Sequence, residues 1–130
     1  MTTDFSGSAA PIRLQNLVIL CIDDKKVLLD LHKAVLQAAG YDVLTATTQS
    51  EGMEIFKTFK VDLVLTDHLI KGESGVGVAE MVKGMRPEVP VGIYSGAVEV
   101  PADTRFADAF LSKSMGSTQF LVEVGRLLKL

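Results

Sequence analysis

The chain has 130 residues, of which 48% are hydrophobic and 22% are charged, a length and balance that suit one compact domain with a single core. Its formal net charge of −3 gives no electrostatic reason to expect nucleic acid or an anionic membrane as a direct partner. The single cysteine, Cys21, cannot form an internal disulfide, which favours a reducing compartment and a cytoplasmic protein. No apolar run approaches the length that spans a bilayer.

The beginning of the chain is rich in Thr, Ser, Ala and Gly. It lacks the basic start and the apolar stretch of a signal peptide. We therefore expect residues 1–14 to form a flexible tail and residues 15–130 to form one domain.

After the tail, short apolar runs alternate with amphipathic stretches. The run Leu17–Ile22 is typical of a strand that is buried on both faces. A helical stretch follows and ends at Gly40, a residue type favoured just beyond a helix C-terminus. Tyr41–Ala46 predicts the second strand. The capping-box pattern that begins at Thr48 predicts a second helix, which continues through Phe59.

The second half of the chain continues this alternation. Val61–Thr66 predicts a third strand that ends at Asp67, and a loop with several glycines then leads to a third helix. Two prolines break the chain before Val91–Tyr94, the predicted fourth strand. The remaining elements are a short helix, a strand and a last helix, predicted around Ala102–Phe106, over Ala109–Leu111 and from Ser117 as its cap.

Strands that alternate with helices imply right-handed crossovers and a parallel sheet with helices on both faces. Five such units predict an α/β fold, a doubly wound five-stranded sheet of flavodoxin-like order 2-1-3-4-5. In that order, ligands bind beyond the carboxyl ends of the strands, where the winding reverses. The conspicuous polar residues follow those strand ends: Asp23, Asp24, Asp67, Ser95 and Lys113.

These residue types suit one kind of chemistry. Three carboxylates at adjacent strand ends repel one another, so without compensation at least one should have a raised pKa. Mg²⁺ binds a few carboxylate or carbonyl oxygens and also accepts phosphate oxygens. A carboxylate beside such an ion can attack phosphorus and become an acyl phosphate. Lys113 and the Ser95 hydroxyl are suited to bind the oxygens of the transferred group.

The four segments that carry these residues read VILCIDD, VDLVLTD, GIYSGA and DAFLSK. In this order and at these strand ends, they closely resemble the receiver domain of bacterial two-component response regulators. The resemblance covers Leu17 to Leu130. Since no effector domain is visible, we expect a single-domain regulator that is similar to the chemotaxis response regulators.

The resemblance implies a phosphorelay function. Asp67 would accept a phosphoryl group from a phosphohistidine on a sensor histidine kinase or a histidine phosphotransfer protein. The Mg²⁺ ligands that it implies are Asp23, Asp24, Asp67 and the backbone carbonyl of Leu69.

The resemblance also implies a switch, in which Phe110 turns inward when the Ser95 hydroxyl moves toward the phosphoryl group. Such a domain catalyses its own phosphorylation and slow dephosphorylation but is not an enzyme in the usual sense. Its output partner is unknown, and homodimerisation is a possible response.

Two departures from the family pattern concern the loops around the site. The family usually follows its lysine with a cis proline, whereas this chain has Lys113-Ser114. A cis bond before a residue other than proline costs about 3 kcal/mol, so we predict a trans bond or an altered loop. The usual Met-Pro after the phosphoacceptor is replaced by Ile70-Lys71, which places an extra cation near the site.

Two further departures concern the lifetime of the phosphorylated form and the surface through which the family signals. Leu69 and Ala97, two positions after Asp67 and Ser95, are apolar. In the family these positions flank the path of the hydrolytic water, and we hypothesise that self-dephosphorylation is slow here. The stretch Val98–Ala107 is short for a fourth helix, so the usual signalling face is expected to be abbreviated or mobile.

Three other functions fit parts of the pattern. A pseudo-receiver would bind a partner without phosphorylation. An aspartate-nucleophile phosphohydrolase of the haloacid dehalogenase type would need a second acid two residues after the first, whereas Asp24 directly follows Asp23. A flavin-binding electron carrier would need a phosphate-binding loop after the first strand, where these two acids would repel phosphate.

Simpler interpretations exist for single residues. Asp23 and Asp24 are also good helix caps. Gly72 and Gly75 are better explained by turn chemistry than by nucleotide binding, because their spacing does not match the dinucleotide fingerprint. His68 is expected at the rim of the site.

Overall fold

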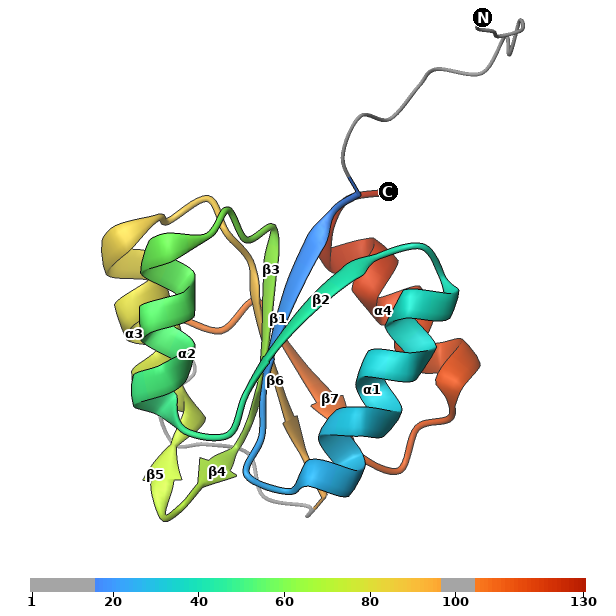
Figure 1. The fold of residues 1–130 in the computed structure, drawn as a ribbon, viewed down its shortest axis with the longest axis horizontal. Coiled ribbons are helices and arrows are strands. Elements are labelled where there is room, and N and C mark those ends of the chain that lie inside the picture. Colours follow the sequence, from blue (N-terminus) through green and yellow to red (C-terminus); the bar gives the residue numbers. More distant parts are fainter. Residues whose placement is uncertain (1–15, 97–104) are drawn as a thin grey trace, which may run out of the picture.

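The computed structural model describes residues 16–96 and 105–130 (Figure 1). Five parallel strands form its central sheet in the order β2-β1-β3-β6-β7. This is the flavodoxin-like order, so the predicted fold class is confirmed. The strands are β1 (Val18–Ile22), β2 (Asp42–Ala46), β3 (Leu63–Asp67), β6 (Val91–Ser95) and β7 (Ala109–Ser112).

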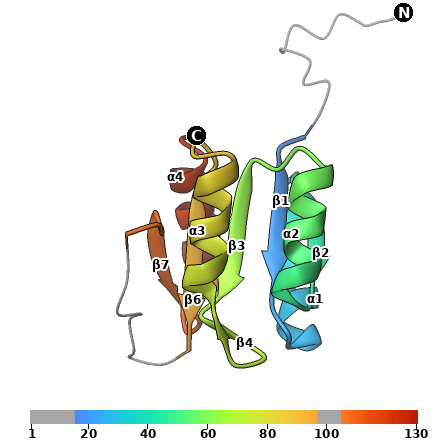
Figure 2. The ribbon, with the colours of Figure 1, turned by 90° about the vertical axis from the view of Figure 1, so that its left-hand side faces the viewer.

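Helices cover both faces of the sheet. In Figures 1 and 2, α2 and α3 lie on one face, and α1 and α4 lie on the other. The predicted tail, residues 1–14, lies outside the described residues, as does most of the predicted short helix around Ala102–Phe106. The helices of the described part are α1 (Lys26–Ala38), α2 (Gln49–Thr58), α3 (Gly75–Met85) and α4 (Ser117–Leu127).

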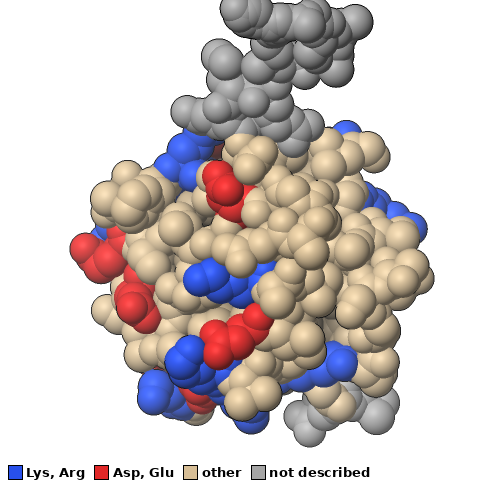
Figure 3. Space-filling model, turned by 45° about the vertical axis from the view of Figure 1, so that its right-hand side comes forward, with Lys and Arg blue, Asp and Glu red and all other residues tan. Residues whose placement is uncertain are grey.

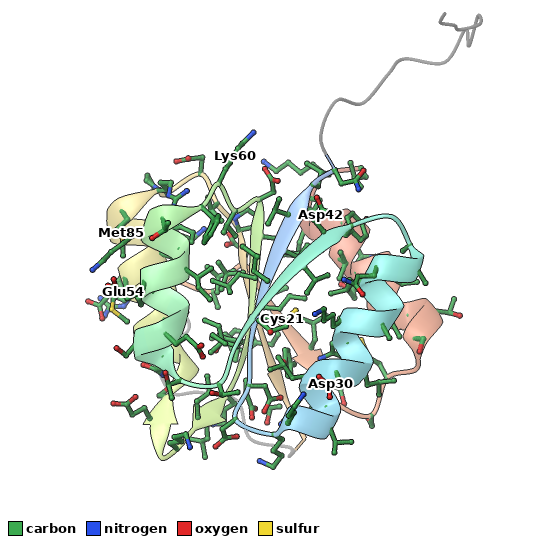
Figure 4. The ribbon with its side chains drawn as sticks, in the orientation of Figure 1. Cys21, Asp30, Asp42, Glu54, Lys60 and Met85 are labelled. Atoms are coloured by element: carbon green, nitrogen blue, oxygen red, sulfur yellow. The ribbon has the colours of Figure 1, made fainter. Side chains whose placement is uncertain are left out.

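The alternation of side chains along β1 shows why this strand is apolar throughout. Leu20 and Ile22 belong to the core cluster under α2 and α3, whereas Ile19 and Cys21 belong to the cluster under α1 and α4. All four side chains are fully buried. Figure 4 shows Cys21 inside the molecule, where burial raises the pKa of its thiol to about 12. Cys21 is therefore a core residue, as the sequence suggests.

The residues that the sequence assigns to helix ends are confirmed at two positions and are wrong at two others. Gly40 has a positive φ of 98° beyond α1. Thr48 caps α2 by accepting a 3.1 Å hydrogen bond from the backbone N–H of Glu51. Phe59 was expected inside this helix, but it is the C-cap with an extended backbone and is 52% exposed. Likewise, Gly116 rather than Ser117 is the N-cap of α4.

The third strand starts later than predicted, at Leu63 rather than Val61, and includes Asp67. The cause is Asp62, whose carboxylate accepts a 2.8 Å hydrogen bond from the backbone N–H of Val18. A side-chain acceptor thus replaces a ladder carbonyl at this end of the strand.

The loop predicted after Asp67 contains a small hairpin, which the sequence did not indicate. Strands β4 (Leu69–Ile70) and β5 (Glu73–Ser74) pair in antiparallel fashion. Lys71 and Gly72, between them, both have positive φ, at 50° and 82°, as a tight two-residue hairpin turn requires. The prediction of turn chemistry is therefore confirmed for Gly72.

Gly75 has a different role from the one predicted. A Cβ at this position would collide with the backbone carbonyl oxygen of Asp67. Close packing of α3 against the end of β3, and not a positive φ, requires a glycine there.

The surface seen from the side of α1 and α4 carries acidic and basic side chains interspersed among uncharged residues (Figure 3). Among the described residues, no helix combines the length and the apolar character that crossing a bilayer requires.

Candidate phosphoryl-transfer site

Three carboxylates meet at the carboxyl end of the sheet, the lower end in Figure 1. Asp23 and Asp24 follow β1, and Asp67 ends the neighbouring strand β3. Each carboxylate offers an oxygen, and the three oxygens lie within 4.8 Å of one another. The structure therefore brings together the three acids that the sequence singled out.

Lys113 supplies the positive charge at this cluster. Its Nζ lies 2.9 Å from Oδ1 of Asp67. The backbone N–H of Lys113 donates a 2.9 Å hydrogen bond to the carbonyl of Ser95, which extends the pairing of β6 with β7. A Cβ on Gly96 would lie 3.3 Å from the Lys113 side chain, so the glycine makes room for the stem of the lysine.

The loop after Lys113 is held without a proline. The described residues contain no cis peptide bond, so the predicted trans bond at Lys113-Ser114 is confirmed. The hydroxyl oxygen of Ser112 accepts a 3.1 Å hydrogen bond from the backbone N–H of Ser114 and lies 2.6 Å from the Ser114 hydroxyl. These contacts stabilise the turn that orients the lysine.

Asp23 is the carboxylate with the raised pKa. Its side chain is fully buried, and its Oδ1 accepts a 2.9 Å hydrogen bond from the backbone N–H of Lys25. Burial raises the pKa of Asp23, the Lys25 N–H opposes this rise, and the charge of Asp67 adds to it. A raised pKa at one carboxylate was predicted, but its main cause is burial rather than charge repulsion.

Asp24 is the more exposed partner in the pair. Its Oδ2 accepts a 2.9 Å hydrogen bond from the backbone N–H of Lys71, and this bond is the main cause of a lowered Asp24 pKa. Lys71 therefore does act on the site, chiefly through its backbone. The Oδ1 atom of Asp24 is buried and has no hydrogen-bond partner, although the ammonium group of Lys25 lies 3.8 Å away.

Neither acid caps α1. The N-cap residue is Lys25, and no side chain accepts a capping hydrogen bond there. The capping interpretation of Asp23 and Asp24 is therefore wrong, and their oxygens point to a shared cluster instead.

Tyr94 is a site residue that the sequence did not single out. It lies in β6 opposite Asp67 in the sheet register and is 2% exposed. Its hydroxyl donates a hydrogen bond of 3.4 Å to Oδ2 of Asp23. Nζ of Lys113 lies 5.7 Å from the centre of its ring, within the range of a cation–π contact. Burial raises the pKa of Tyr94 well above its ordinary value, so the hydroxyl keeps its proton.

Two further rings stand behind Tyr94. His32 of α1 meets it edge-on, with ring centres 4.9 Å apart, and Phe120 of α4 stacks on His32 at 4.7 Å. Burial lowers the pKa of His32, and the charge of Lys113 lowers it further. These three residues and Lys113 also line a small cavity between α1, α4 and β7.

The other predicted site residues lie around this centre. Ser95 ends β6 and is paired in register with Ser112. Leu69 begins the hairpin two residues after Asp67 and is 50% exposed. Phe110 lies on β7 and is 40% exposed. Ala97 lies outside the described residues.

The donor set of this cluster fits a hard divalent cation. Carboxylate oxygens in close proximity are the ligands that Mg²⁺ prefers. The Asp24 Oδ1 atom, buried without a hydrogen bond, is an oxygen that a cation would satisfy. The arrangement can therefore hold a divalent cation next to Asp67 and Lys113.

The sequence matches the family described as "Response regulator receiver domain" over residues 19–124. The fold and the acidic site are those expected of such a domain, and the chain belongs to this family of two-component signalling modules. The resemblance inferred from its motifs is thus confirmed.

Several curated relatives are regulators or sensors. The transcriptional regulatory protein GlrR of Escherichia coli (strain K12) is 30% identical over 105 residues, which is 81% of this chain and 22% of that protein. YvrH of Bacillus subtilis, also a transcriptional regulatory protein, is 34% identical over 71 residues, 54% of this chain and 30% of its own length. This chain therefore spans less than a third of either relative.

Solved structures show the same fold. A response regulator receiver domain protein from Clostridium thermocellum is 27% identical with a TM-score of 0.79, covering 87% of this chain and 94% of that one. The response regulator protein TrrA of Thermotoga maritima, in complex with Mg²⁺ and BeF, is 26% identical with a TM-score of 0.80. That alignment covers 85% of this chain and 98% of TrrA.

Proposed function

We propose that residues 15–130 accept a phosphoryl group on Asp67 in a Mg²⁺-dependent reaction. The donor is a phosphohistidine of a sensor histidine kinase or a histidine phosphotransfer protein. The proposal rests on one observation: three clustered carboxylates lie at the carboxyl end of the sheet together with Lys113, whose Nζ lies 2.9 Å from Oδ1 of Asp67. The free Cys21 is consistent with a meeting of donor and receiver in the cytoplasm.

Asp67 acts as the nucleophile. One of its carboxylate oxygens forms a bond to phosphorus while the bond from phosphorus to the donor imidazole nitrogen breaks. The electron pair of the broken bond stays on that nitrogen, and the product is an acyl phosphate on Asp67. Lys113 and the Ser95 hydroxyl bind oxygens of the transferred group, where negative charge is spread in the transition state.

The metal ligands in this proposal are Asp23, Asp24, Asp67 and the backbone carbonyl of Leu69. Bound there, Mg²⁺ would offset the charge of the carboxylates and of the phosphoryl oxygens. The hydrogen bonds from the backbone N–H groups of Lys25 to Asp23 and of Lys71 to Asp24 fix the two carboxylates that would hold the ion.

The phosphorylated form signals through Ser95 and Phe110. The Ser95 hydroxyl follows the phosphoryl group, and the side chain of Phe110, now partly exposed on β7, turns inward. Through this change the domain relays phosphate or docks to an output partner, and homodimerisation is one form that such an output can take. The matched regions cover only 30% of YvrH and 22% of GlrR, so what the rest of those two proteins does carries no information about this chain.

Phosphorylation of the purified protein tests the proposal. The protein is incubated with Mg²⁺ and either acetyl phosphate or phosphoramidate, whose P–N bond stands in for phosphohistidine, and its intact mass is measured. We expect one labile phosphoryl adduct that disappears with EDTA and in Asp67→Ala. The matched control is Asp30→Ala, which removes an exposed aspartate of α1 that pairs with Lys26 and should leave the adduct unchanged.

Two results would contradict the proposal. If wild-type protein forms no adduct with either donor, the chain is a phosphorylation-independent interaction module. If it instead turns over phosphate esters without a stable adduct, it is a phosphohydrolase.

A further inference from the structure

We infer that Tyr94 is a positioning residue for the metal site: its hydroxyl orients Asp23, and its ring supports Lys113. This inference rests on the proposed function, since it concerns the Mg²⁺ ligands of the same site. Tyr94 lies in the segment GIYSGA, directly before Ser95.

The strand register explains how Tyr94 reaches both groups. Side chains alternate along a strand, and Tyr94 shares the core cluster under α1 and α4 with Cys21 and Leu65. Asp23 comes two residues after Cys21 and Asp67 two residues after Leu65. Asp23 and Asp67 therefore lie on the same side of the sheet as Tyr94.

The contact with Asp23 is the more specific of the two. The hydroxyl of Tyr94 donates to Oδ2, and the backbone N–H of Lys25 donates to Oδ1, so each oxygen of this fully buried carboxylate has one donor. An oxygen that accepts one hydrogen bond retains a lone pair for a cation. Hydrogen bonds of this kind orient a metal-binding carboxylate, and their loss typically weakens metal binding about 10- to 100-fold.

The ring of Tyr94 is itself fixed. It is 2% exposed, and His32 packs edge-on against it with ring planes at 86°. His32 is held in turn by Phe120, whose ring stacks on the His32 ring with the two planes at 13°. Because the ring has no freedom to move away, the hydroxyl is held toward Asp23, and a face of the ring remains available to Lys113.

Two substitutions separate the two roles. Tyr94→Phe removes only the hydroxyl, whereas Tyr94→Leu also removes the ring. For Tyr94→Phe, we expect the Mg²⁺ dissociation constant, measured from amide chemical shifts with Mg²⁺ alone, to rise about tenfold. The Mg²⁺ concentration for half-maximal phosphorylation by acetyl phosphate should rise by the same factor, with little change in the maximal rate. Tyr94→Leu should lower the maximal rate as well, because Lys113 loses its support.

Tyr41→Phe is the matched control, because Tyr41 is the other tyrosine of the chain and lies next to β2, away from the acids. It should bind Mg²⁺ like the wild type. In the Tyr41→Phe variant Tyr94 is the sole tyrosine, and the chain has no tryptophan, so the ultraviolet absorption of this variant reports on the Tyr94 hydroxyl directly. Mg²⁺ should change that absorption with the same concentration dependence as the amide shifts.

The outcomes distinguish this inference from the proposed function. An unchanged Mg²⁺ dissociation constant in folded Tyr94→Phe, or a tyrosine absorption that does not respond to bound Mg²⁺, overturns the role of Tyr94 alone. Loss of stability in urea without a change in Mg²⁺ affinity means a merely structural role and also overturns it. Failure of the wild type to bind Mg²⁺ overturns both.

Discussion

Nζ of Lys113 lies 2.9 Å from Oδ1 of Asp67, and both side chains are largely withdrawn from solvent, at 19% and 4% exposure. Lys113 directly follows β7 and Asp67 ends β3, and these two strands are separated in the sheet by β6. Removing one partner of such a buried pair leaves the other charge uncompensated. The pair therefore couples the end of the last strand of the sheet to Asp67, the proposed phosphoacceptor.

Replacing Lys113 should impair phosphorylation more than it impairs folding. Lys113→Met removes the charge that offsets three clustered carboxylates, and the loss of one such group typically costs about 100-fold in rate. We expect that fall in the rate of adduct formation from acetyl phosphate at saturating Mg²⁺. Lys113→Arg should restore only part of the rate, because a planar guanidinium does not replace a compact ammonium group.

The control for this prediction is Lys60→Met. Lys60 is exposed and lies at the opposite end of the molecule from the acids (Figure 4). Its loss should leave the rate unchanged. An equal rate in Lys113→Met and Lys60→Met would remove Lys113 from the proposed mechanism.

Gly75→Ala should destabilise the protein, because a methyl group there meets the backbone carbonyl of Asp67. Backbone atoms cannot move aside cheaply, and overpacking of this kind costs roughly 1–3 kcal/mol. Gly84→Ala in the same helix meets nothing within 4 Å and should stabilise the protein by about 0.5–1 kcal/mol, since alanine is the better helix former. Urea unfolding of the three proteins measures both changes. Opposite signs are expected, and equal effects would contradict the packing argument.

Leu69→Asn should shorten the lifetime of the acyl phosphate. Leu69 is 50% exposed at the start of the hairpin, two residues after Asp67, and offers no polar atom to orient an attacking water. One added hydrogen bond that stabilises the attacking water in the transition state corresponds to about a tenfold faster hydrolysis of the acyl phosphate. The decay of the adduct after removal of free phosphodonor gives the rate. Val122→Asn, a like change at an exposed position of α4, is the control. An unchanged or slower decay in Leu69→Asn would count against the role of Leu69.

His32 should make the stability of the protein depend on pH. Burial, with a smaller effect of Lys113, lowers the pKa of His32 in the folded state, whereas an unfolded histidine titrates near about 6.5. Below that pH the unfolded chain binds more protons at this residue than the folded chain does, so stability falls as the pH falls. His32→Phe keeps the aromatic contacts with Tyr94 and Phe120 but cannot titrate.

The comparison of urea midpoints for wild type and His32→Phe tests this sign. Their difference should be constant between pH 8.5 and 7.5, where neither state of His32 gains a proton, and should move in favour of His32→Phe as the pH falls from 6.5 to 5.5. A constant difference over the whole range would contradict the prediction.

Much of the fold follows from local patterns. Residues 18–22 form a strand because apolar side chains are needed on both faces of a parallel sheet, and Gly40 ends the first helix because a positive φ is required there. The patterns are weaker at element ends. Phe59 has the right spacing for a helix, but the chain must leave the helix to enter the sheet. The hairpin of β4 and β5 has strands of only two residues, too short for any periodicity.

The sequence by itself determined the chemical types at the strand ends, namely the acids after β1 and β3 and the lysine after β7. Strand alternation and order were enough to place them at one edge of the sheet. Only the tertiary structure decided how they are supported. Tyr94 reaches Asp23 across 71 positions of sequence, and Lys71 reaches Asp24 across 47. Such contacts depend on strand register and loop path, which arise from hydrogen bonding and packing between elements and leave no periodic signal along the chain.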